Sequence, residues 1–517
     1  MKNILEWLEQ QEEKRPDALA VDDGNKTYTW RELSERARAI GELLCEECSP
    51  GQPVAILADK STEVLAAMMG IVYAGCFYVI ISPGQPIDRR AHIFQVLDAK
   101  ALITGREHRE KATEAGYTGK ILQLEELMEA AEKAGENKTP QGTAAGDLLK
   151  ERRQRATDRD ILYGIFTSGS TGVPKCIVVS HRAVLDFITH FVDTFHLTAE
   201  ERFGNQAPFD FDVSVKDIYS SMAVGAPLIL IPKELFSTPA GLLDYLEEKQ
   251  ATVLVWAVSA LTLVSSLKGL QYKVPSQVKK IMFSGEVMPA KQLRIWQEAL
   301  PETEFANIYG PTEITCNCTY HKIDRMVEDG EKLPVGIPFE GRKVFLRNTE
   351  EKELGGKTVE IGEICVAGES ISDGYYHNQE ETDKRFLTHT FADGKQAWCY
   401  CTGDLGYYGE QGELYFAGRK DFQIKHMGHR IELEEIERSM EQIPGVERSC
   451  CGLDTRRGKL VAFYMGEAEV KEIRTRLKKA VPVYMIPQKF VQMEKMPLTK
   501  NGKTDRGYFR ARLEGDA

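Results

Sequence analysis

Apolar residues in the first quarter of the chain form short unbroken runs separated by one stretch with helical spacing. VAILAD (54–59) and CFYVIIS (76–82) are typical of strands, and Thr62 to Ala74 fits a helix between them. Strand, helix and strand in this order form the unit of a parallel sheet. ALIT (101–104) and KILQL (120–124) continue the series. The pattern predicts an α/β fold.

Two regions near this sheet have different patterns. At the N-terminus, Ile4, Leu5, Trp7 and Leu8 share one side of a predicted amphipathic helix. Residues 126–160 are charged, rich in Gly and Ala, and contain few large apolar side chains. Such composition favours a surface linker over a contribution to the core.

A second α/β series begins at ILYGIFTS (161–168). Strands are predicted at 227–231, 252–256, 279–283 and 304–308, with helices between them. Antiparallel strands are predicted within 335–368, and GELYFAGRKDFQIK (412–425) has the pattern of a hairpin. The remainder, from about residue 422, predicts a small α+β unit.

Length and charge narrow the class of protein. A chain of 517 residues is too long for one core, so two to four packed units are expected. Lys and Arg number 66 against 78 Asp and Glu, a net charge of −12, which argues against nucleic acid as the main ligand. No apolar run is long enough to insert in a membrane, and the N-terminus lacks a signal-peptide core, so a cytoplasmic protein is expected.

The eleven cysteines do not form a clear framework. Cys45 and Cys48 make one CxxC, and the pairs Cys316/Cys318 and Cys399/Cys401 are CxC. A zinc site needs a second pair or histidines at ligand spacing. Buried thiols are therefore favoured over metal or redox roles.

FTSGSTGVPK (166–175) is the first stretch that suggests chemistry. An apolar strand leads into it, and Gly169 and Gly172 can turn backbone N–H groups toward an anion. Hydroxyl donors come from Thr167, Ser168, Ser170 and Thr171, and a cation from Lys175. The spacing is not that of a Walker A motif. Alone, such a stretch is more typical of a flexible surface loop than of a phosphate-binding loop.

Four further motifs follow in order: NIYGPTE (307–313), CTGDLGYY (401–408), GRKDFQIKHMGHRIELEEIE (418–437) and LTKNGKTDR (498–506). Singly, each is typical of a turn. Together with the loop at 166–175 they resemble the adenylate-forming superfamily, which includes acyl-CoA synthetases, luciferases and amino-acid adenylation domains. The resemblance extends from residue 27 to residue 506.

The resemblance implies both fold and reaction. We expect a large N-terminal domain (1–420) of parallel sheets with helices plus a small β-barrel-like unit, and a small α+β C-terminal domain (421–517) on a hinge at Asp421. In this superfamily a substrate carboxylate attacks the α-phosphate of ATP, pyrophosphate leaves with Mg²⁺, and a thiol then attacks the acyl-adenylate. A monomer is expected.

Residue roles follow from the matched motifs. The resemblance assigns Lys503, Thr312 and Glu313 to catalysis, and Glu313 also to the metal. It assigns nucleotide binding to Thr167, Ser168, Gly169, Ser170, Thr171, Gly172, Lys175, Gly285, Glu286, Asn307, Tyr309, Gly310, Asp404, Arg419 and Lys503. Phe416 replaces a tyrosine that family members often carry near the nucleotide. His429 is expected to be structural.

APFDFDVSVKDIY (207–219) resembles the acyl pocket of amino-acid-activating members, with Asp212 as partner of the substrate α-ammonium. Several stretches are most similar to D-alanine–carrier-protein ligases, which implies D-alanine as substrate and a phosphopantetheinyl carrier protein in trans. A peptide-synthetase-type enzyme for another amino acid, including an acidic one, and an acyl-CoA synthetase remain alternatives. A third alternative is a nucleotide-binding scaffold that has lost catalysis, and the presence of Glu313, Asp404, Arg419 and Lys503 argues against it. The family alignment places these residues around the pocket: Asp212, Val213, Lys216, Trp256, Met282, Ser284, Ile308, Cys316, Asn317 and Lys503.

Lys216 and Ser284 depart from the D-alanine enzymes, and Lys216 leaves two interpretations. Its ammonium can leave a small pocket with its stem packed on Trp256, which is the expected arrangement and suits D-alanine. Alternatively it points inward and pairs with an acidic substrate side chain. For an acidic carrier protein, the cations of KEIRTRLKK (471–479), with Lys425 and Arg430, are the predicted contact.

Overall fold

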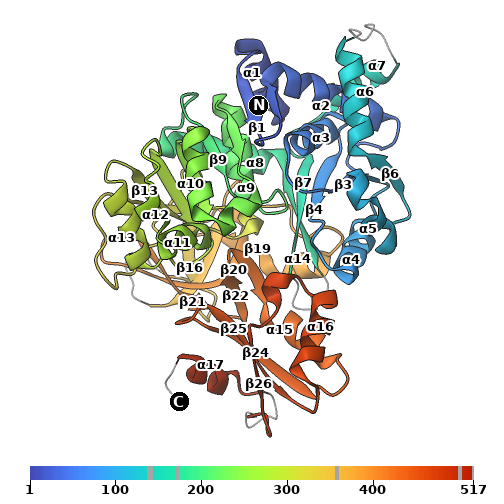
Figure 1. Ribbon diagram of the computed structural model, residues 1–517. Coiled ribbons are helices and arrows are strands. Elements are labelled where there is room, and N and C mark those ends of the chain that lie inside the picture. Colours follow the sequence, from blue (N-terminus) through green and yellow to red (C-terminus); the bar gives the residue numbers. More distant parts are fainter. Residues whose placement is uncertain (137–143, 169–173, 355–359, 499–503, 515–517) are drawn as a thin grey trace.

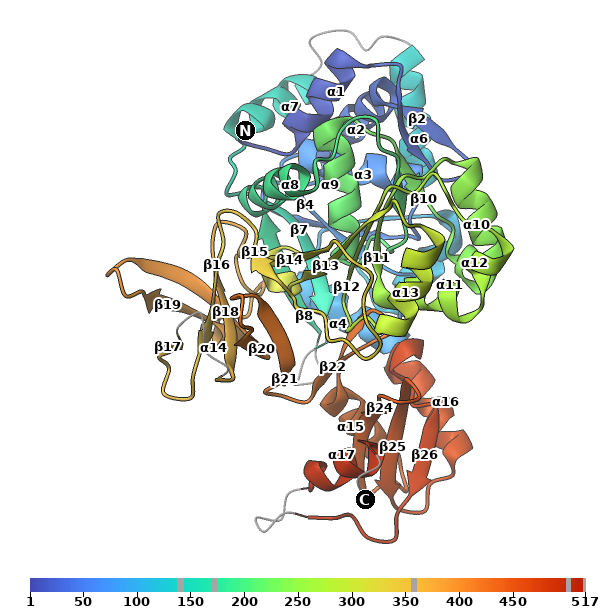
Figure 2. The same ribbon diagram turned by 90° about the vertical axis from the view of Figure 1, so that its left-hand side faces the viewer.

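The computed structural model describes residues 1–136, 144–168, 174–354, 360–498 and 504–514. Two α/β lobes lie side by side above a small C-terminal domain (Figure 1). A third unit, an antiparallel sheet, projects to one side and is clearest in Figure 2.

The first lobe is a six-stranded sheet. Its strands are β3 (Pro53–Leu57), β4 (Phe77–Ile81), β5 (Ala101–Thr104), β6 (Lys120–Gln123), β7 (Ile161–Thr167) and β8 (Lys175–Ser180). They lie in the order β6-β5-β3-β4-β7-β8, with only β8 antiparallel to its neighbour. Every residue of β3 and β4 is buried, because helices cover both faces of the sheet. The predicted strand–helix–strand unit is confirmed.

The helices of this lobe begin at the N-terminus. They are α1 (Leu5–Lys14), α2 (Trp30–Cys45), α3 (Thr62–Tyr73), α4 (Ile87–Leu97), α5 (Arg109–Glu114), α6 (Leu124–Glu136) and α7 (Ala144–Arg155). As predicted, the apolar side of the first helix, with Ile4 and Leu8, is buried. No helix of the described residues combines the length and apolar character needed to cross a bilayer.

The interpretation of 126–160 as a surface linker was wrong. Helices α6 and α7 occupy most of this segment and pack against α2. Leu127, Met128 and Leu149 are buried in the main core. A helix needs only one apolar stripe to pack, and the many Glu, Lys and Ala residues on the other faces concealed that stripe.

The second lobe is a nine-stranded sheet. Its strands are β1 (Leu19–Asp22), β2 (Thr27–Thr29), β9 (Phe203–Asn205), β10 (Leu228–Leu230), β11 (Val253–Ala257), β12 (Lys280–Ser284), β13 (Glu304–Tyr309), β14 (Thr319–Ile323) and β15 (Ile337–Pro338). Helices α8 (His181–Phe195), α9 (Val213–Val224), α10 (Pro239–Glu248), α11 (Val258–Ser266), α12 (Gly269–Tyr272) and α13 (Ala290–Ala299) accompany them. The strand order is β15-β14-β13-β12-β11-β9-β10-β1-β2. The four strands predicted in this region are β10 to β13.

The third unit is an antiparallel sheet. It contains β16 (Lys343–Arg347), β17 (Glu353–Leu354), β18 (Gly362–Ala367), β19 (Phe386–Thr390), β20 (Gln396–Tyr408) and β21 (Leu414–Arg419), with helix α14 (Gln379–Arg385). The order is β17-β16-β18-β20-β19, and β21 also pairs with β20. The described strands therefore leave free edges, and the unit is an open sheet where a barrel-like unit was expected.

The predicted hairpin at 412–425 was wrong. β21 pairs with β20 of the large domain, whereas β22 (Gln423–His426) pairs with β23 (His429–Glu432). The chain therefore passes from one sheet to another between Arg419 and Gln423. Alternating polar and apolar residues predicted two strands here but could not show their partners.

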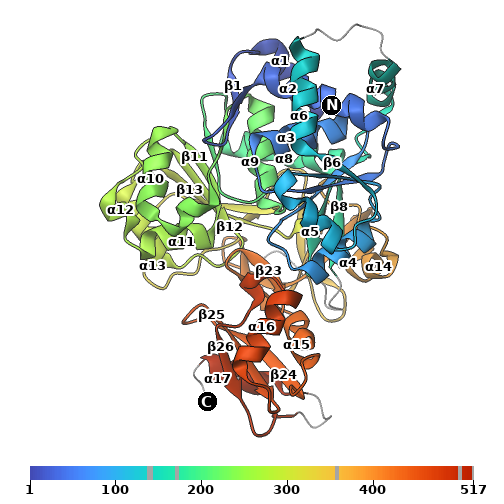
Figure 3. The same ribbon diagram turned by 45° about the vertical axis from the view of Figure 1, so that its right-hand side comes forward.

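The small domain follows β23. Strands β24 (Arg448–Asp454), β25 (Lys459–Met465) and β26 (Lys489–Gln492) form a sheet with helices α15 (Leu433–Glu441), α16 (Val470–Ala480) and α17 (Arg506–Glu514). The predicted α+β character is confirmed. Figure 3 shows β23 between this domain and the lobes above it, and α17 on the opposite side of the small domain.

Candidate active site

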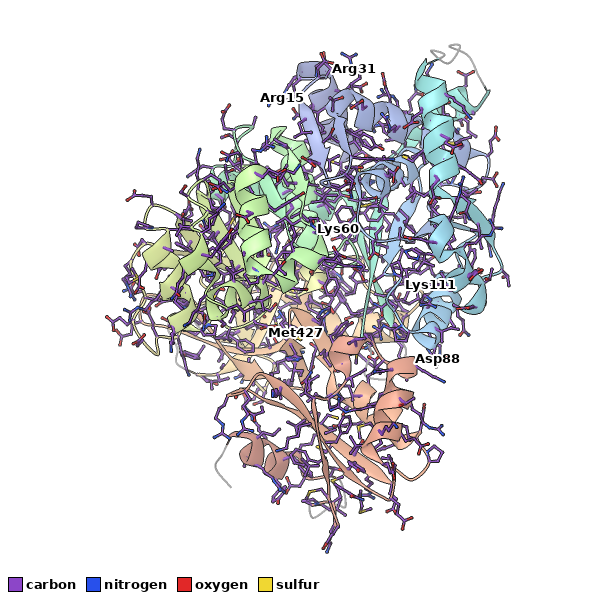
Figure 4. The ribbon with its side chains drawn as sticks, viewed as in Figure 1. Arg15, Arg31, Lys60, Asp88, Lys111 and Met427 are labelled. Atoms are coloured by element: carbon purple, nitrogen blue, oxygen red, sulfur yellow. The ribbon has the colours of Figure 1, made fainter. Side chains whose placement is uncertain are left out.

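A cavity of about 110 Å³ lies where the two lobes meet the β22–β23 hairpin. Met427, in the turn of this hairpin, is labelled at the junction in Figure 4. The cavity joins residues that are distant in sequence. From the predicted set it is lined by Thr167, Ser168, Asp212, Val213, Lys216, Ser284, Gly285, Gly310, Thr312, Cys316, Asp404 and Arg419.

Glu313 lies beside this cavity and is held by an arginine of the hairpin. Its carboxylate is fully buried, and Nη1 of Arg430 lies 2.8 Å from each of its oxygens. Tyr375 donates a hydrogen bond of 2.7 Å to the same group. Burial alone would raise the pKa of Glu313, but the charge of Arg430 and the hydrogen bond from Tyr375 lower it to about 2. Glu313 is therefore ionised at neutral pH.

Asp404 is at the centre of a second charged cluster. Tyr309 donates a hydrogen bond of 2.6 Å to Asp404, and Arg419 forms an ion pair with the same carboxylate. Nε of Arg419 also lies 2.6 Å from Asp421. Arg419 thus links Asp404 to the predicted hinge residue Asp421.

The described parts of the 166–175 stretch lie near both clusters. Ser168 donates a hydrogen bond of 3.0 Å to the backbone carbonyl of Arg430. Lys175 forms an ion pair of 2.6 Å with Glu381 and does not line the cavity. Gly169, Ser170, Thr171 and Gly172 lie outside the described residues, as does Lys503.

Of the other nucleotide candidates, Gly285 and Gly310 line the cavity, whereas Glu286, Asn307 and Tyr309 do not. The side-chain amide of Asn307 donates a hydrogen bond of 2.8 Å to the carbonyl of Pro334, and Glu286 accepts a hydrogen bond from the backbone N–H of Gly428. A Cβ at Gly310 would lie 2.5 Å from the Cα of Asn317, so this close approach of two backbone segments requires glycine. Phe416, which replaces the tyrosine often found in the family, has a partly buried ring that packs against the main core.

Asp212 and Val213 are held at the start of α9. The thiol of Cys316 donates a hydrogen bond of 3.1 Å to the backbone carbonyl of Asp212, and Cys316 lines the cavity beside it. Burial raises the pKa of Cys316 well above its usual range, and the nearby carboxylate of Asp212 adds to this. The side chain is therefore a neutral thiol.

The expected outward position of Lys216 was wrong. The side chain is 1% exposed and points inward. Its Nζ donates a hydrogen bond of 2.9 Å to Oδ1 of Asn317 and one of 3.4 Å to Oγ of Ser284. Residues 214–222 of α9 are all buried, so the side chain reaches the cavity and not the outer surface.

Of the predicted pocket residues that the structure describes, four do not line the cavity: Trp256, Met282, Ile308 and Asn317. Met282 and Ile308 are buried in the main core, and Trp256 belongs to a separate core that contains Phe283. Trp256 pairs in register with Phe283, one position beyond Met282, so it lies on the opposite face of the sheet. Its indole N–H donates to the carbonyl of Gly204.

Two contacts between the domains were not predicted from the sequence. Arg89 of α4 forms a buried ion pair of 2.6 Å with Glu435 of α15. The ring of His429 stacks on Tyr484 and meets the edge of Phe211. Burial lowers the pKa of His429 to about 4, and the nearby His426 contributes. This agrees with a structural role for His429.

The predicted grouping of Lys425 and Arg430 with residues 471–479 was wrong. Lys425 and Arg430 line the cavity, so they do not form one outward surface with α16. The exposed cations of α16 are Lys471, Arg474, Arg476, Lys478 and Lys479. All eleven cysteines are buried and free.

Comparison with known proteins then identifies the family. The model described as "AMP-binding enzyme" matches residues 8–376. The chain belongs to this family of AMP-binding enzymes. Surfactin synthase subunit 1 of Bacillus subtilis (strain 168) is 32% identical over 512 residues, which is 98% of this chain but 14% of that protein. The chain therefore spans only a small part of the length of that synthase subunit.

Solved structures show the same fold. The Vibrio cholerae adenylation domain AlmE, in complex with glycyl-adenosine-5'-phosphate, has a TM-score of 0.83 at 22% identity and covers 99% of this chain and 97% of its own. NpsA-ThdA, an artificially fused adenylation–PCP di-domain NRPS from Klebsiella oxytoca, has a TM-score of 0.80 at 22% identity, with coverage of 95% and 93%. The α/β fold with large and small domains is that of nonribosomal-peptide-type adenylation domains.

Proposed function

We propose that this chain activates an amino acid with ATP, forms an aminoacyl-adenylate with release of pyrophosphate, and transfers the aminoacyl group to a phosphopantetheine thiol. One observation carries the proposal. The same cavity is lined by Asp212 and by Asp404 and Arg419, so an amine and a nucleotide can meet within it.

The roles taken from the family motifs fit this cavity. Asp404 and Arg419 would bind the ribose, Tyr309 the adenine, and Thr312 the α-phosphate. Tyr309 and Arg419 already hold the Asp404 carboxylate, which would orient it to accept from a diol. Asp212 would bind the substrate α-ammonium.

Glu313 would hold Mg²⁺ during adenylation. It fits a hard cation because it is an ionised oxygen ligand, but Arg430 bonds to both of its oxygens here. Metal binding at Glu313 and this position of the hairpin therefore exclude one another. When bound, the metal would neutralise charge on the departing pyrophosphate.

Two domain orientations follow from this exclusion. We assign the present one to thiol transfer, with 1–420 as the large domain, 421–517 as the mobile one and Asp421 as the hinge. Lys503 would reach the substrate carboxylate only in the other orientation.

The acceptor would be a phosphopantetheinylated carrier, and the exposed cations of α16 are the proposed contact for its acidic surface. The D-alanine interpretation needs a pocket without a buried cation. Because Lys216 points inward, we do not propose D-alanine as the substrate.

The test is amino-acid-dependent exchange of labelled pyrophosphate into ATP, followed by product analysis. AMP and pyrophosphate are expected, and ADP with orthophosphate would refute the proposal. Thioester formation on a phosphopantetheinylated carrier, compared with free coenzyme A, identifies the acceptor. A preference for coenzyme A would assign the chain to the acyl-CoA synthetases.

A further inference from the structure

The amino group of Lys216 is a buried charge without a counter-charge of its own. Only neutral atoms hold it, the amide oxygen of Asn317 and the hydroxyl of Ser284. Within the described residues, Lys216 forms no ion pair at 4.0 Å or less. Burying an ammonium costs free energy unless an anion compensates. A third N–H of Lys216 remains for another acceptor.

The neighbouring carboxylate of Asp217 serves a different cluster. It is fully buried and accepts a hydrogen bond of 2.9 Å from Asn205, whose side-chain oxygen in turn accepts one from Lys60. Figure 4 labels Lys60 between the two lobes. Burial raises the pKa of Asp217 to about 7, although Asn205, Lys216 and Lys60 lower it. A carboxyl that is only half-ionised near neutral pH compensates Lys216 poorly.

Asp212 lies one helical turn before Lys216, and both line the cavity. Residues four apart on a helix project on the same side, separated by about one turn of 5.4 Å. The wall thus presents a carboxylate and an ammonium to whatever occupies the pocket. The complementary molecule carries an ammonium and, a few carbon atoms away, a carboxylate.

We propose that the pocket selects a dicarboxylic amino acid, aspartate or glutamate. Its α-ammonium binds Asp212 and its side-chain carboxylate binds Lys216, which Asn317 and Ser284 orient. The α-carboxylate stays free to react. This inference rests on the proposed function, because it takes Asp212 as the anchor of the α-amine.

The experiment compares acids with their amides in the exchange assay. Aspartate, glutamate, asparagine, glutamine, alanine and D-alanine are each tested with the wild-type chain. The preferred acid is expected to exceed its own amide in kcat/KM by roughly 30- to 1000-fold, because the amide leaves the ammonium without a counter-charge. This comparison needs no mutant and so does not depend on a variant that folds.

Lys216→Met keeps the length of the side chain and removes its charge. We expect it to reduce exchange with the dicarboxylic acid by a similar factor and to reduce the preference for acid over amide to below about tenfold. Lys249→Met is the matched control, since Lys249 pairs with Asp22 at the end of β1 and neither residue lines the cavity. It should keep the wild-type ratio of acid to amide.

The outcomes separate the two proposals. Preference of the wild-type chain for alanine, D-alanine or an amide would overturn the dicarboxylic substrate and leave the adenylation function intact. An acid preference unchanged in Lys216→Met would equally overturn the role of Lys216. A third outcome is that no amino acid supports exchange, but glutamate or aspartate raises the melting temperature of the wild-type chain and not that of Lys216→Met. This outcome would refute adenylation and retain the proposed binding of the acid by Lys216. Absence of both exchange and stabilisation would overturn both proposals.

Discussion

Replacing Arg430 by Gln is expected to impair thiol transfer while sparing adenylation. Arg430 contacts Glu313 only while the hairpin lies in the cavity, so its loss removes a bond from one orientation alone. The other orientation, in which we propose that Glu313 binds the metal, does not use this arginine. The two half-reactions should therefore respond differently.

The magnitude follows from the burial of Glu313. The fall of its pKa from an ordinary 4.5 to about 2 corresponds to roughly 3 kcal/mol of net stabilisation of the carboxylate. Loss of one partner from a buried ion pair typically costs about 3–5 kcal/mol. Either figure shifts a two-state equilibrium by on the order of 100-fold or more. The stabilisation is complete above pH 4.5 and declines only as the pH falls toward 2, so the experiment can be run at neutral pH.

The assay separates the steps. Pyrophosphate exchange measures adenylation, and single-turnover transfer from preformed aminoacyl-adenylate to a carrier thiol measures the second step. We expect transfer to fall about 100-fold and exchange to stay within about threefold. Arg457→Gln, an exposed arginine of the small domain, is the control and should change neither. Equal loss in both steps, or undiminished transfer, would show that the Arg430–Glu313 pair does not hold the transfer orientation.

Three other changes test the same arrangement. Arg89→Ala should weaken transfer more than exchange, because it leaves Glu435 buried without its partner at a cost of about 3–5 kcal/mol; identical kinetics in both steps would contradict this. The depressed pKa of His429 means that its docked, neutral form is fully favoured above pH 6.5 and is lost as the pH falls toward 4, so transfer should decline in that window. His429→Phe should flatten this part of the pH–rate profile, and an unchanged profile would exclude the histidine. Lys503→Ala should slow exchange by about 10²–10³ and affect transfer from preformed adenylate much less; wild-type exchange would remove Lys503 from catalysis.

The sequence was sufficient to predict most strands of the sheets, but it could not show toward which face of a sheet a given side chain points. Buried strands such as β3 are apolar throughout, which identifies them without structure. By contrast, the orientation of Trp256 depends on which residue of β12 lies beside it, and no local pattern encodes that register. The apolar stripe of α6 was present in the sequence, but the surrounding Glu and Lys residues outweighed it in a reading based on composition.

The motifs located the site but not its internal bonds. Asp404 and Arg419 were grouped by family resemblance, and the structure brings them into contact. The pairing of Glu313 with Arg430 joins positions 117 residues apart, and only a particular docking of the small domain creates it. Lys216 could not be placed either, since the sequence of a helix start allows a long side chain to point inward or to reach solvent.

Cys316 shows how a protein can handle a reactive acyl group without consuming it. A thiolate beside an acyl-adenylate would attack it and leave the protein acylated. At Cys316 the sulfur lines the cavity, yet burial keeps its proton in place and the proton is directed to the backbone of Asp212. The Cys316 thiol is thus unreactive while the acyl-adenylate is present. Under the proposed function an external carrier thiol then consumes that intermediate, and an alkylating reagent should modify the carrier far faster than this enzyme.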